Sequence, residues 1–379
     1  MYALFLKEIR SFLNSLIGYL TITIFLLAVG LFMWVFSGME NVFEMRLATL
    51  NALFYNAPVI MMFIIPAITM RSFAEEKRTG TIELLFTKPL TDTQIMLGKF
   101  LSGLTIILIA LVPTFIYYLT IYYIGDPVGN IDNGETLGGY IGLIFISAIF
   151  MAMGIFCSVM TKNQVISFMF ALLLCFLFYS GFDLLGNFQW VGTWDGVIQG
   201  IGIRSHYQNL QKGILDSRDV TYFLSMIGTF LVLTRLVLLS RKKSASNLWQ
   251  SLIVVAILIM LNLLGFVKSW RADLTEDQIH SLTPGFEQLL ENDLEDIAYV
   301  QVFLAGDDFP AEVENLRRNV EDKLIEFNRI SGGLVKYEFI DPDEDTIMAQ
   351  TYIPQLQEAG LSVKIVEKAH EGTLSTIYF

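Results

Sequence analysis

Charged residues, cysteines and histidines are all scarce in this sequence. Only 16% of the 379 residues are charged, well below the roughly 25% of ordinary soluble domains. The two cysteines, Cys157 and Cys175, lie inside apolar runs, which excludes a disulfide framework or a cysteine-based zinc site. The three histidines stand far from one another and from both cysteines, so we predict no metal site.

Motifs for nucleotide and peptide chemistry are also missing. The chain has no G-x-x-x-x-G-K-[ST] loop to hold ATP phosphates and no H-E-x-x-H zinc motif. The pair Gly200 and Gly202 lacks the third glycine of a dinucleotide-binding turn. We therefore expect no catalytic residues, no enzyme activity and no cofactor belonging to this chain.

Long apolar runs are what the sequence does contain. Hydrophobic residues make up 54% of the chain and the mean hydropathy is +0.55. A membrane-spanning helix needs about 20 apolar residues, and seven stretches reach that length: 17–36, 52–70, 100–124, 139–160, 164–185, 221–240 and 248–267. We predict a polytopic α-helical membrane protein, with six spans in the domain 17–243 and a seventh transmembrane helix in 244–267.

Basic residues in the short loops set the expected orientation of these spans. Eleven Lys and Arg residues fall on the side of the N-terminus, against four on the other side. The N-terminus is therefore expected in the cytoplasm. With seven spans, the C-terminal part is expected on the other side of the lipid bilayer.

Residues 1–16 precede the first span and carry apolar residues at helical spacing, among them Phe5, Ile9 and Phe12. Lys7 and Glu8 lie between these apolar positions. The pattern predicts an amphipathic helix lying in the cytoplasmic interface of the bilayer. A plain extension of the first span into water is the alternative.

The longest cytoplasmic loop is expected at residues 71–99. Gly80 can break the chain, and Thr81 can cap a short helix that ends at Pro89. Thr91 or Asp92 can cap a second helix that leads into the third span. A short amphipathic helix with exposed carboxylates fits a groove on a partner protein. A solvated charged loop without a partner is the alternative.

The loop follows the pattern E-E-x-x-x-G-T-x-E-x-L, then Pro, then G-K. The matching residues are Glu75, Glu76, Gly80, Thr81, Glu83, Leu85, Pro89, Gly98 and Lys99, and Leu84 stands at the free position before Leu85. Together with the pair Lys7-Glu8 before the first span, this pattern resembles the ABC-2 type permeases. The resemblance implies a homodimer of six-span subunits docked on a separate cytoplasmic ABC ATPase, which binds the ATP. It also implies that Lys7, Glu8 and the residues from Glu75 to Pro89 contact that ATPase.

Residues 268–379 differ from the rest of the chain in charge. They hold 9 Lys and Arg against 23 Asp and Glu, whereas residues 1–267 hold 16 against 14. This acidic balance disfavours nucleic acid as a partner. Strands predicted at 297–305, 333–341, 361–367 and 373–379 alternate with helices at 310–330 and 346–359, which indicates an α/β domain with a parallel or mixed sheet. Because the chain stops inside an apolar strand, we expect a partial, truncated domain.

The start of this C-terminal domain carries a second resemblance. Asp273-Leu274-Thr275, Ser281-Leu282-Thr283 and Asp341-Pro342 are similar to the auxiliary component of gliding-motility (Gld-type) ABC permeases. The resemblance implies a fusion of the permease with an extracytoplasmic auxiliary domain. It places the protein in a bacterial inner membrane with the C-terminal domain in the periplasm.

Two further features lie on the expected outer side. Asp183, at the end of the fifth span, fits either the translocation path or an ordinary interfacial carboxylate. The connection 186–220 contains Trp190, Trp194 and Tyr207, which fit either a segment that dips into the bilayer or a simple loop.

Two functions agree with these features. The first is the permease subunit of an ABC transporter, which couples ATP hydrolysis by a separate ATPase to export or to envelope work of the gliding-motility type. The second is a membrane-anchored envelope assembly or binding protein whose acidic outer domain recruits partners. In the second case, the loop 71–99 is dispensable.

Overall fold

The computed structural model covers the whole chain in two compact units, which are described separately. The membrane unit comprises Met1–Asp183 and Gln199–His280, and the C-terminal unit comprises Leu184–Ile198 and Ser281–Phe379. The structure describes residues 1–37, 41–45, 47–187, 200–239, 245–265, 270–276, 282, 284–294, 296–302, 304, 311–340, 366–370 and 373–377.

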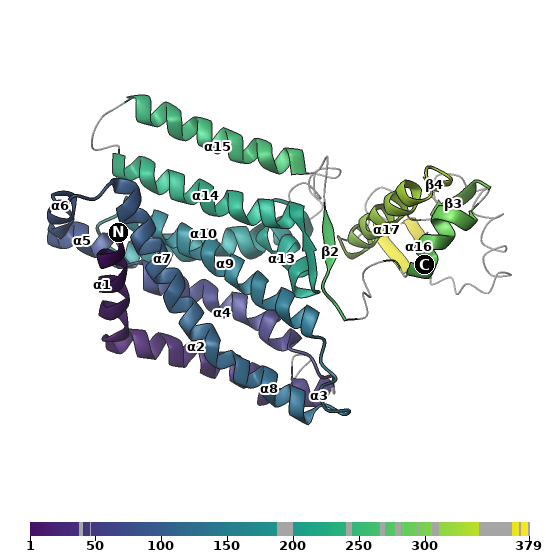
Figure 1. The fold of residues 1–379 in the computed structure, drawn as a ribbon, viewed down its shortest axis with the longest axis horizontal. Helices are drawn as coiled ribbons and strands as arrows, with labels where there is room; N and C mark the ends of the chain where they lie inside the picture. Colours follow the sequence, from purple (N-terminus) through teal and green to yellow (C-terminus); the bar gives the residue numbers. More distant parts are fainter. Residues whose placement is uncertain are drawn as a thin grey trace. The chain divides into compact units, whose positions relative to one another are not determined.

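The membrane unit is a bundle of helices with one short pair of strands (Figure 1). Its helices are α1 (Tyr2–Leu13), α2 (Leu16–Trp34), α3 (Val42–Met45), α4 (Asn51–Thr69), α5 (Ala74–Thr79), α6 (Thr81–Phe86), α7 (Asp92–Leu111), α8 (Phe115–Ile124), α9 (Asn133–Met160), α10 (Gln164–Phe176), α13 (Ile203–Gln211), α14 (Ser217–Leu239) and α15 (Ala245–Gly265). The helix α11 (Phe182–Asn187) follows a π-turn at Leu177–Gly181. The strands β1 (Ile214–Asp216) and β2 (Arg271–Asp273) pair antiparallel.

All seven predicted spans coincide with helices. Within the described parts of the chain, five helical stretches are long and apolar enough to cross a membrane: Asn51–Thr79, Asp92–Ile124, Asn133–Met160, Gln164–Leu185 and Ser217–Leu238. A sixth is obtained when α1 and α2, which are bent by 68° at the break between them, are taken as one span. The helix α15 contains a shorter apolar stretch, Ile253–Asn262. A membrane crossing by α15 therefore stays a prediction.

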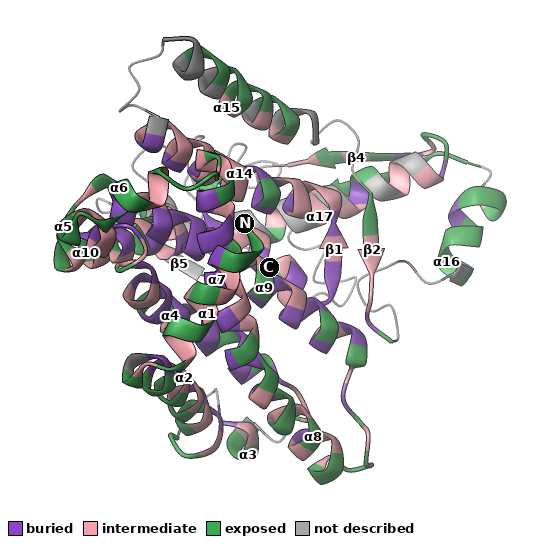
Figure 2. Ribbon diagram, turned by 60° about the vertical axis from the view of Figure 1, so that its left-hand side comes forward, coloured by how far each residue is buried: buried purple, intermediate pink, exposed green. Residues whose placement is uncertain are grey.

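The helix α9 lies at the centre of the bundle. It packs against α4, α7, α10, α13 and α14, and Leu143, Ile146 and Phe150 on it are fully buried. Figure 2 shows α9 mostly in the colour of buried residues, whereas α2 and α8 carry many exposed ones. Its 28 residues, at 1.5 Å per residue, give a rod about 42 Å long.

The described part of the predicted connection 186–220 contains a helix, α13, that enters the bundle. Tyr207 on α13 is 1% exposed, and its hydroxyl donates a hydrogen bond to the backbone oxygen of Phe54 at 2.7 Å. Burial raises the pKa of Tyr207, so its hydroxyl keeps the proton that this bond needs. The connection is thus not a simple loop in this part, while Trp190 and Trp194 lie outside the described residues.

The C-terminal unit contains a β-α-β arrangement, as predicted. The strands β3 (Ala298–Val302) and β4 (Val335–Phe339) pair in parallel, with α17 (Ala311–Ile330) between them in the chain. A short helix, α16 (Pro284–Gln288), contributes Phe286, whose ring lies 5.4 Å from that of Phe327 on α17. The strands predicted at 297–305 and 333–341 and the helix predicted at 310–330 are confirmed in their described residues.

Among the described residues, the parallel pair of β3 and β4 agrees with the expected parallel or mixed sheet, but the last two strands do not join it. The strands β5 (Val366–His370) and β6 (Thr373–Ile377) form their own antiparallel pair, apart from β3 and β4. The physical reason is the short connection: strands so close in sequence can pair as an antiparallel hairpin, whereas parallel strands need a crossover of a dozen or more residues. The helix predicted at 346–359 lies outside the described residues.

Candidate functional site

The predicted loop 71–99 folds into two short helices separated by a left-handed glycine. Gly80 has φ 76°, a conformation in which side-chain-bearing residues are strained, and it ends α5 and begins α6. Thr81 is the first residue of α6 and makes no capping bond; its hydroxyl lies 2.9 Å from that of Thr79. The predicted break at Gly80 is confirmed, and the predicted cap at Thr81 is wrong because the glycine occupies the cap position.

The helix α6 has one face in the protein and one in solvent. Ile82 is 3% exposed, whereas Leu84 is 64% exposed and Glu83 is exposed beside it. Leu85 is half-buried and packs against the core. The helix ends at Phe86, ahead of Pro89. The outward face of α6 thus presents an apolar side chain next to a carboxylate.

The helix α5 is fixed to one end of α9. The hydroxyl of Ser158 accepts hydrogen bonds from the backbone N–H groups of Phe73 at 3.0 Å and Ala74 at 3.1 Å, and donates to the backbone oxygen of Met70 at 3.2 Å. The ammonium of Lys77 donates to the backbone oxygen of Val159. Because these bonds satisfy the first turn of α5, movement of α5 is expected to act directly on α9.

A buried lysine joins α1, α5 and α7. Lys99 on α7 has only 3% of its side chain exposed, and its ammonium lies 2.8 Å from Oε1 of Glu76 and 3.2 Å from Oε1 of Glu8. The ring of Phe73 adds a cation–π contact, with its centroid 5.2 Å from the ammonium. Glu8 and Glu76, both predicted site residues, are therefore brought together by a third charged residue. We call Glu8, Lys99 and Glu76 the buried triad.

The remaining predicted residues surround this triad without belonging to it. Lys7 is 66% exposed and lies 3.8 Å from Glu8, so it adds a cation at the surface. Glu75 is half-buried. The second oxygen of Glu76 is buried and, among the described residues, has no hydrogen-bond partner. The buried triad is thus an ion network in which, among the described residues, one oxygen of Glu76 accepts no hydrogen bond.

Sequence reasoning treated Lys99 as a loop cation and as part of the G-K pattern, and did not foresee its ion pairs with Glu8 and Glu76. The available signal was its position: it lies two turns inside α7, after the apolar pair Ile95-Met96 and before a long apolar run. An ionisable residue inside a membrane helix is expected to face a partner. That partner could not be identified from the sequence alone.

Asp183 lies away from the buried triad, in α11 at the end of a span. Its carboxylate is 3.7 Å from Nε of Arg204 on α13. The ion pair agrees with an ordinary interfacial carboxylate. A place for Asp183 on a translocation path stays a prediction.

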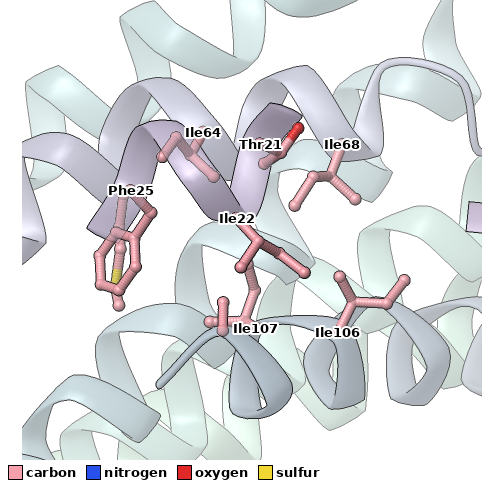
Figure 3. A pocket seen from close by; sticks show the side chains of 9 residues that line it. Thr21, Ile22, Phe25, Ile64, Ile68, Ile106 and Ile107 are labelled. Atoms are coloured by element: carbon pink, nitrogen blue, oxygen red, sulfur yellow. The ribbon is translucent and has the colours of Figure 1, made fainter. Parts of the chain in front are cut away.

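A small apolar cavity lies between α2, α4 and α7 (Figure 3). Its lining is formed by isoleucine, methionine, phenylalanine and alanine side chains, with Thr21 as the polar exception. Neither Asp183 nor the buried triad contributes to it. The cavity is therefore lined by no charged side chain that could bind a charged ligand. Among the residues that the structure describes, no three His, Cys, Asp or Glu side chains gather as metal ligands.

Comparison with known protein families divides the chain close to β2. Residues 276–379 match a family described as a Domain of unknown function (DUF7088). No curated protein matches the chain. Residues 2–274, well over half of the chain, match the family described as ABC-2 family transporter protein. Members are membrane subunits that work with a cytoplasmic ABC ATPase and lack an ATPase of their own. The chain therefore belongs to the ABC-2 family and is a multi-pass membrane permease subunit of an ABC transporter.

Proposed function

We propose that α1, α5 and α6 form the surface on which the cytoplasmic ATPase docks, and that the buried triad carries the ATPase's movement into the spans. The triad is the observation that supports this most directly. It ties the N-terminal helix (Glu8), the loop helix α5 (Glu76) and the span α7 (Lys99) with two contacts of 3.2 Å or less. A push on α1 or α5 would displace a buried ion network, which resists separation of its charges.

The outward face of α6 is suited to bind a partner. Leu84 can insert into an apolar groove, while Glu83 beside it can pair with a cation at the rim. Apolar anchors supply affinity in such contacts, and charges set the register. The Lys7 ammonium on α1 provides a charge of the opposite sign. ATP itself binds to the partner in this proposal.

The orientation proposed for the membrane unit follows from the same residues. The end of the bundle with α5 and α6 faces the cytoplasm, where the ATPase is, and carries Lys77, Arg78 and Lys88 as the positive-inside rule requires. Two copies of the chain would bind two ATPases. We further propose a bacterial inner membrane, with the C-terminal unit in the periplasm and the transporter used for export or gliding-motility-type envelope work.

The test is capture of a candidate ABC ATPase from the same organism, co-expressed with this protein and purified in detergent. Leu84→Asp should lose the ATPase, whereas Val128→Asp should keep it. The two residues are a matched pair, because each is 64% exposed and Val128 follows α8 in a different part of the unit. Hydrolysis by the captured ATPase is measured alongside.

Equal capture by both variants would show that α6 is not the docking surface. Failure of even the unchanged protein to capture the ATPase would favour the assembly-protein function instead. Size-exclusion chromatography with light scattering on the captured complex tests the proposed stoichiometry of two chains and two ATPases.

A further inference from the structure

A short segment ahead of the C-terminal unit is bound to the membrane unit by backbone hydrogen bonds. We call residues 270–276 the strap. Its strand β2 pairs with β1, the strand between α13 and α14, with Ala272 opposite Leu215. The pairing continues on both sides: the N–H of Ser217 donates to the oxygen of Trp270 at 2.8 Å, and the N–H of Leu274 donates to the oxygen of Gly213 at 2.9 Å. The strap is therefore a docked strand rather than a free linker.

The strap also binds the first turn of α9. Asp132 caps α9 through Oδ1, which accepts from the N–H of Glu135 at 2.8 Å, and its Oδ2 accepts from the N–H of Glu276 at 3.2 Å. The amide of Asn133 donates to the carboxylate of Glu276 at 2.6 Å. One aspartate thus holds both the helix and the strap.

Gly134 on α9 permits this close contact. A Cβ atom at this position would lie 1.6 Å from the backbone oxygen of Leu274, which no real contact allows. Thr275, the next residue of the strap, is 4% exposed. The N-terminal end of α9 around Gly134 therefore forms a close-fitting binding surface for the strap, which we call the seat.

The other end of α9 holds α5, through Ser158 and Val159. The same buried helix therefore contacts the proposed ATPase-facing helix at Ser158 and the strap at Gly134, 24 residues apart or about 36 Å along the axis. In Figure 1, α5 lies at one end of the bundle and β2 at the opposite end. Helices resist stretching, so a shift of α9 along its axis would reach both ends.

We propose that α9 and the strap deliver movement of the ATPase to the C-terminal unit, so that this unit is a mechanically driven output of the transporter. The inference rests on the proposed docking of the ATPase at α5 and α6. In each cycle, α5 displaces α9, and the seat around Gly134 moves the strap. The chain continues from the strap into the C-terminal unit, whose second and longer segment begins at Ser281. Rigid secondary structure with specific contacts at both ends is one of the carriers of such coupling, provided that it moves between two arrangements.

The experiment measures a distance in the full chain bound to its ATPase in lipid nanodiscs. Spin labels are placed at Val128→Cys in the membrane unit and Tyr299→Cys in the C-terminal unit, both well exposed, while the native Cys157 and Cys175 are buried. Distance distributions are compared without nucleotide and with ADP and vanadate. In the protein with an unchanged strap, the distance between the two spin labels should differ between the nucleotide-free state and the state with ADP and vanadate.

Two variants break the strap from different sides. Leu274→Pro removes the N–H that bonds to Gly213, and Gly134→Val fills the seat on α9. Gly200→Val is the control, because an added Cβ there meets nothing within 4 Å. Both strap variants should lose the shift while ATPase capture and hydrolysis stay within twofold of the unchanged protein. Gly200→Val should keep the shift.

A shift that persists in both strap variants would overturn the inference. So would the absence of any shift in the unchanged protein while the ATPase is captured and active; the proposed docking would then still stand. Loss of ATPase capture in the unchanged protein would remove the docking proposal, and this inference with it. If Leu274→Pro fails to fold, Gly134→Val decides.

Discussion

Removing the ammonium of Lys99 should destabilise the membrane unit more than any other single change at the proposed docking end. In Lys99→Met, a side chain of similar length leaves Glu8 and Glu76 facing each other without the cation that lies between them, and among the described residues only the exposed Lys7 stays near Glu8. Their oxygens near Lys99 lie no more than about 6 Å apart. At an effective dielectric constant of about 20, their repulsion is on the order of 3 kcal/mol. Breaking a buried ion pair typically costs about 3–5 kcal/mol.

The partial exposure of Glu8, at 25% of its side chain, places the expected loss near the lower end of that range. We therefore expect Lys99→Met to lower the free energy of unfolding by about 3 kcal/mol. The assay is denaturant unfolding in detergent, followed by tryptophan fluorescence. The compensated variant Lys99→Met with Glu8→Gln and Glu76→Gln removes the stranded charges and should recover most of this loss.

The compensated variant also separates stability from coupling. It should fold and still capture the ATPase through α6. The rate of ATP hydrolysis by the captured ATPase should, however, no longer depend on the conformation of the spans. If Lys99→Met were as stable as the unchanged protein, or the compensated variant no more stable than the single one, the buried triad would not be the ion network described here.

Three further results are expected. Gly80→Val should lower the free energy of unfolding by about 1–2 kcal/mol and weaken ATPase capture, because the left-handed backbone at φ 76° disfavours a β-branched residue although space is free. Gly80→Asn should have a smaller effect on both. Equal effects of the two variants would contradict this reasoning. Ser158→Ala leaves the two buried N–H groups at the start of α5 unpaired and should lower the free energy of unfolding by about 1–3 kcal/mol. Ser147→Ala should cost less, because the Ser147 hydroxyl donates to a backbone oxygen of its own helix. A larger loss for Ser147→Ala would refute the comparison. A membrane-impermeant maleimide added to intact cells should label Asn130→Cys and spare Lys88→Cys, and the reverse labelling would invert the proposed orientation.

The spans could be predicted because their length and apolarity are local properties of the sequence. The break at Gly80 was also predictable, since glycine is the residue that adopts a left-handed turn without strain. The β-α-β order of β3, α17 and β4 follows from a change of apolar spacing along the chain. Each of these features depends on neighbouring residues only.

The buried triad and the strap could not be predicted because they join residues far apart in the chain. Lys99 meets Glu8 across 91 residues and Glu76 across 23. Asp132 meets Glu276 across 144 residues. One sequence specifies which residues carry charge, whereas the packing of α1, α5 and α7 decides which charges meet.

The helix α13 gave a signal that sequence reasoning overlooked. Ile203, Tyr207 and Leu210 recur at helical spacing, and all three are buried against the bundle. Trp190 and Trp194 in the same connection are typical of the bilayer interface, which favoured a dipping segment or a loop over a helix. A nine-residue helix of mostly polar composition is short enough to be taken for a connection.

Photo-cross-linking from α6 tests the central claim most directly. A benzoylphenylalanine replaces Leu84 in one variant and Val128 in another, each in native membranes that contain the ATPase. The docking proposal predicts an ultraviolet-dependent adduct of this chain with the ATPase from position 84 and none from position 128. An adduct from position 128 alone, or none from position 84 while the ATPase co-purifies, would contradict the account.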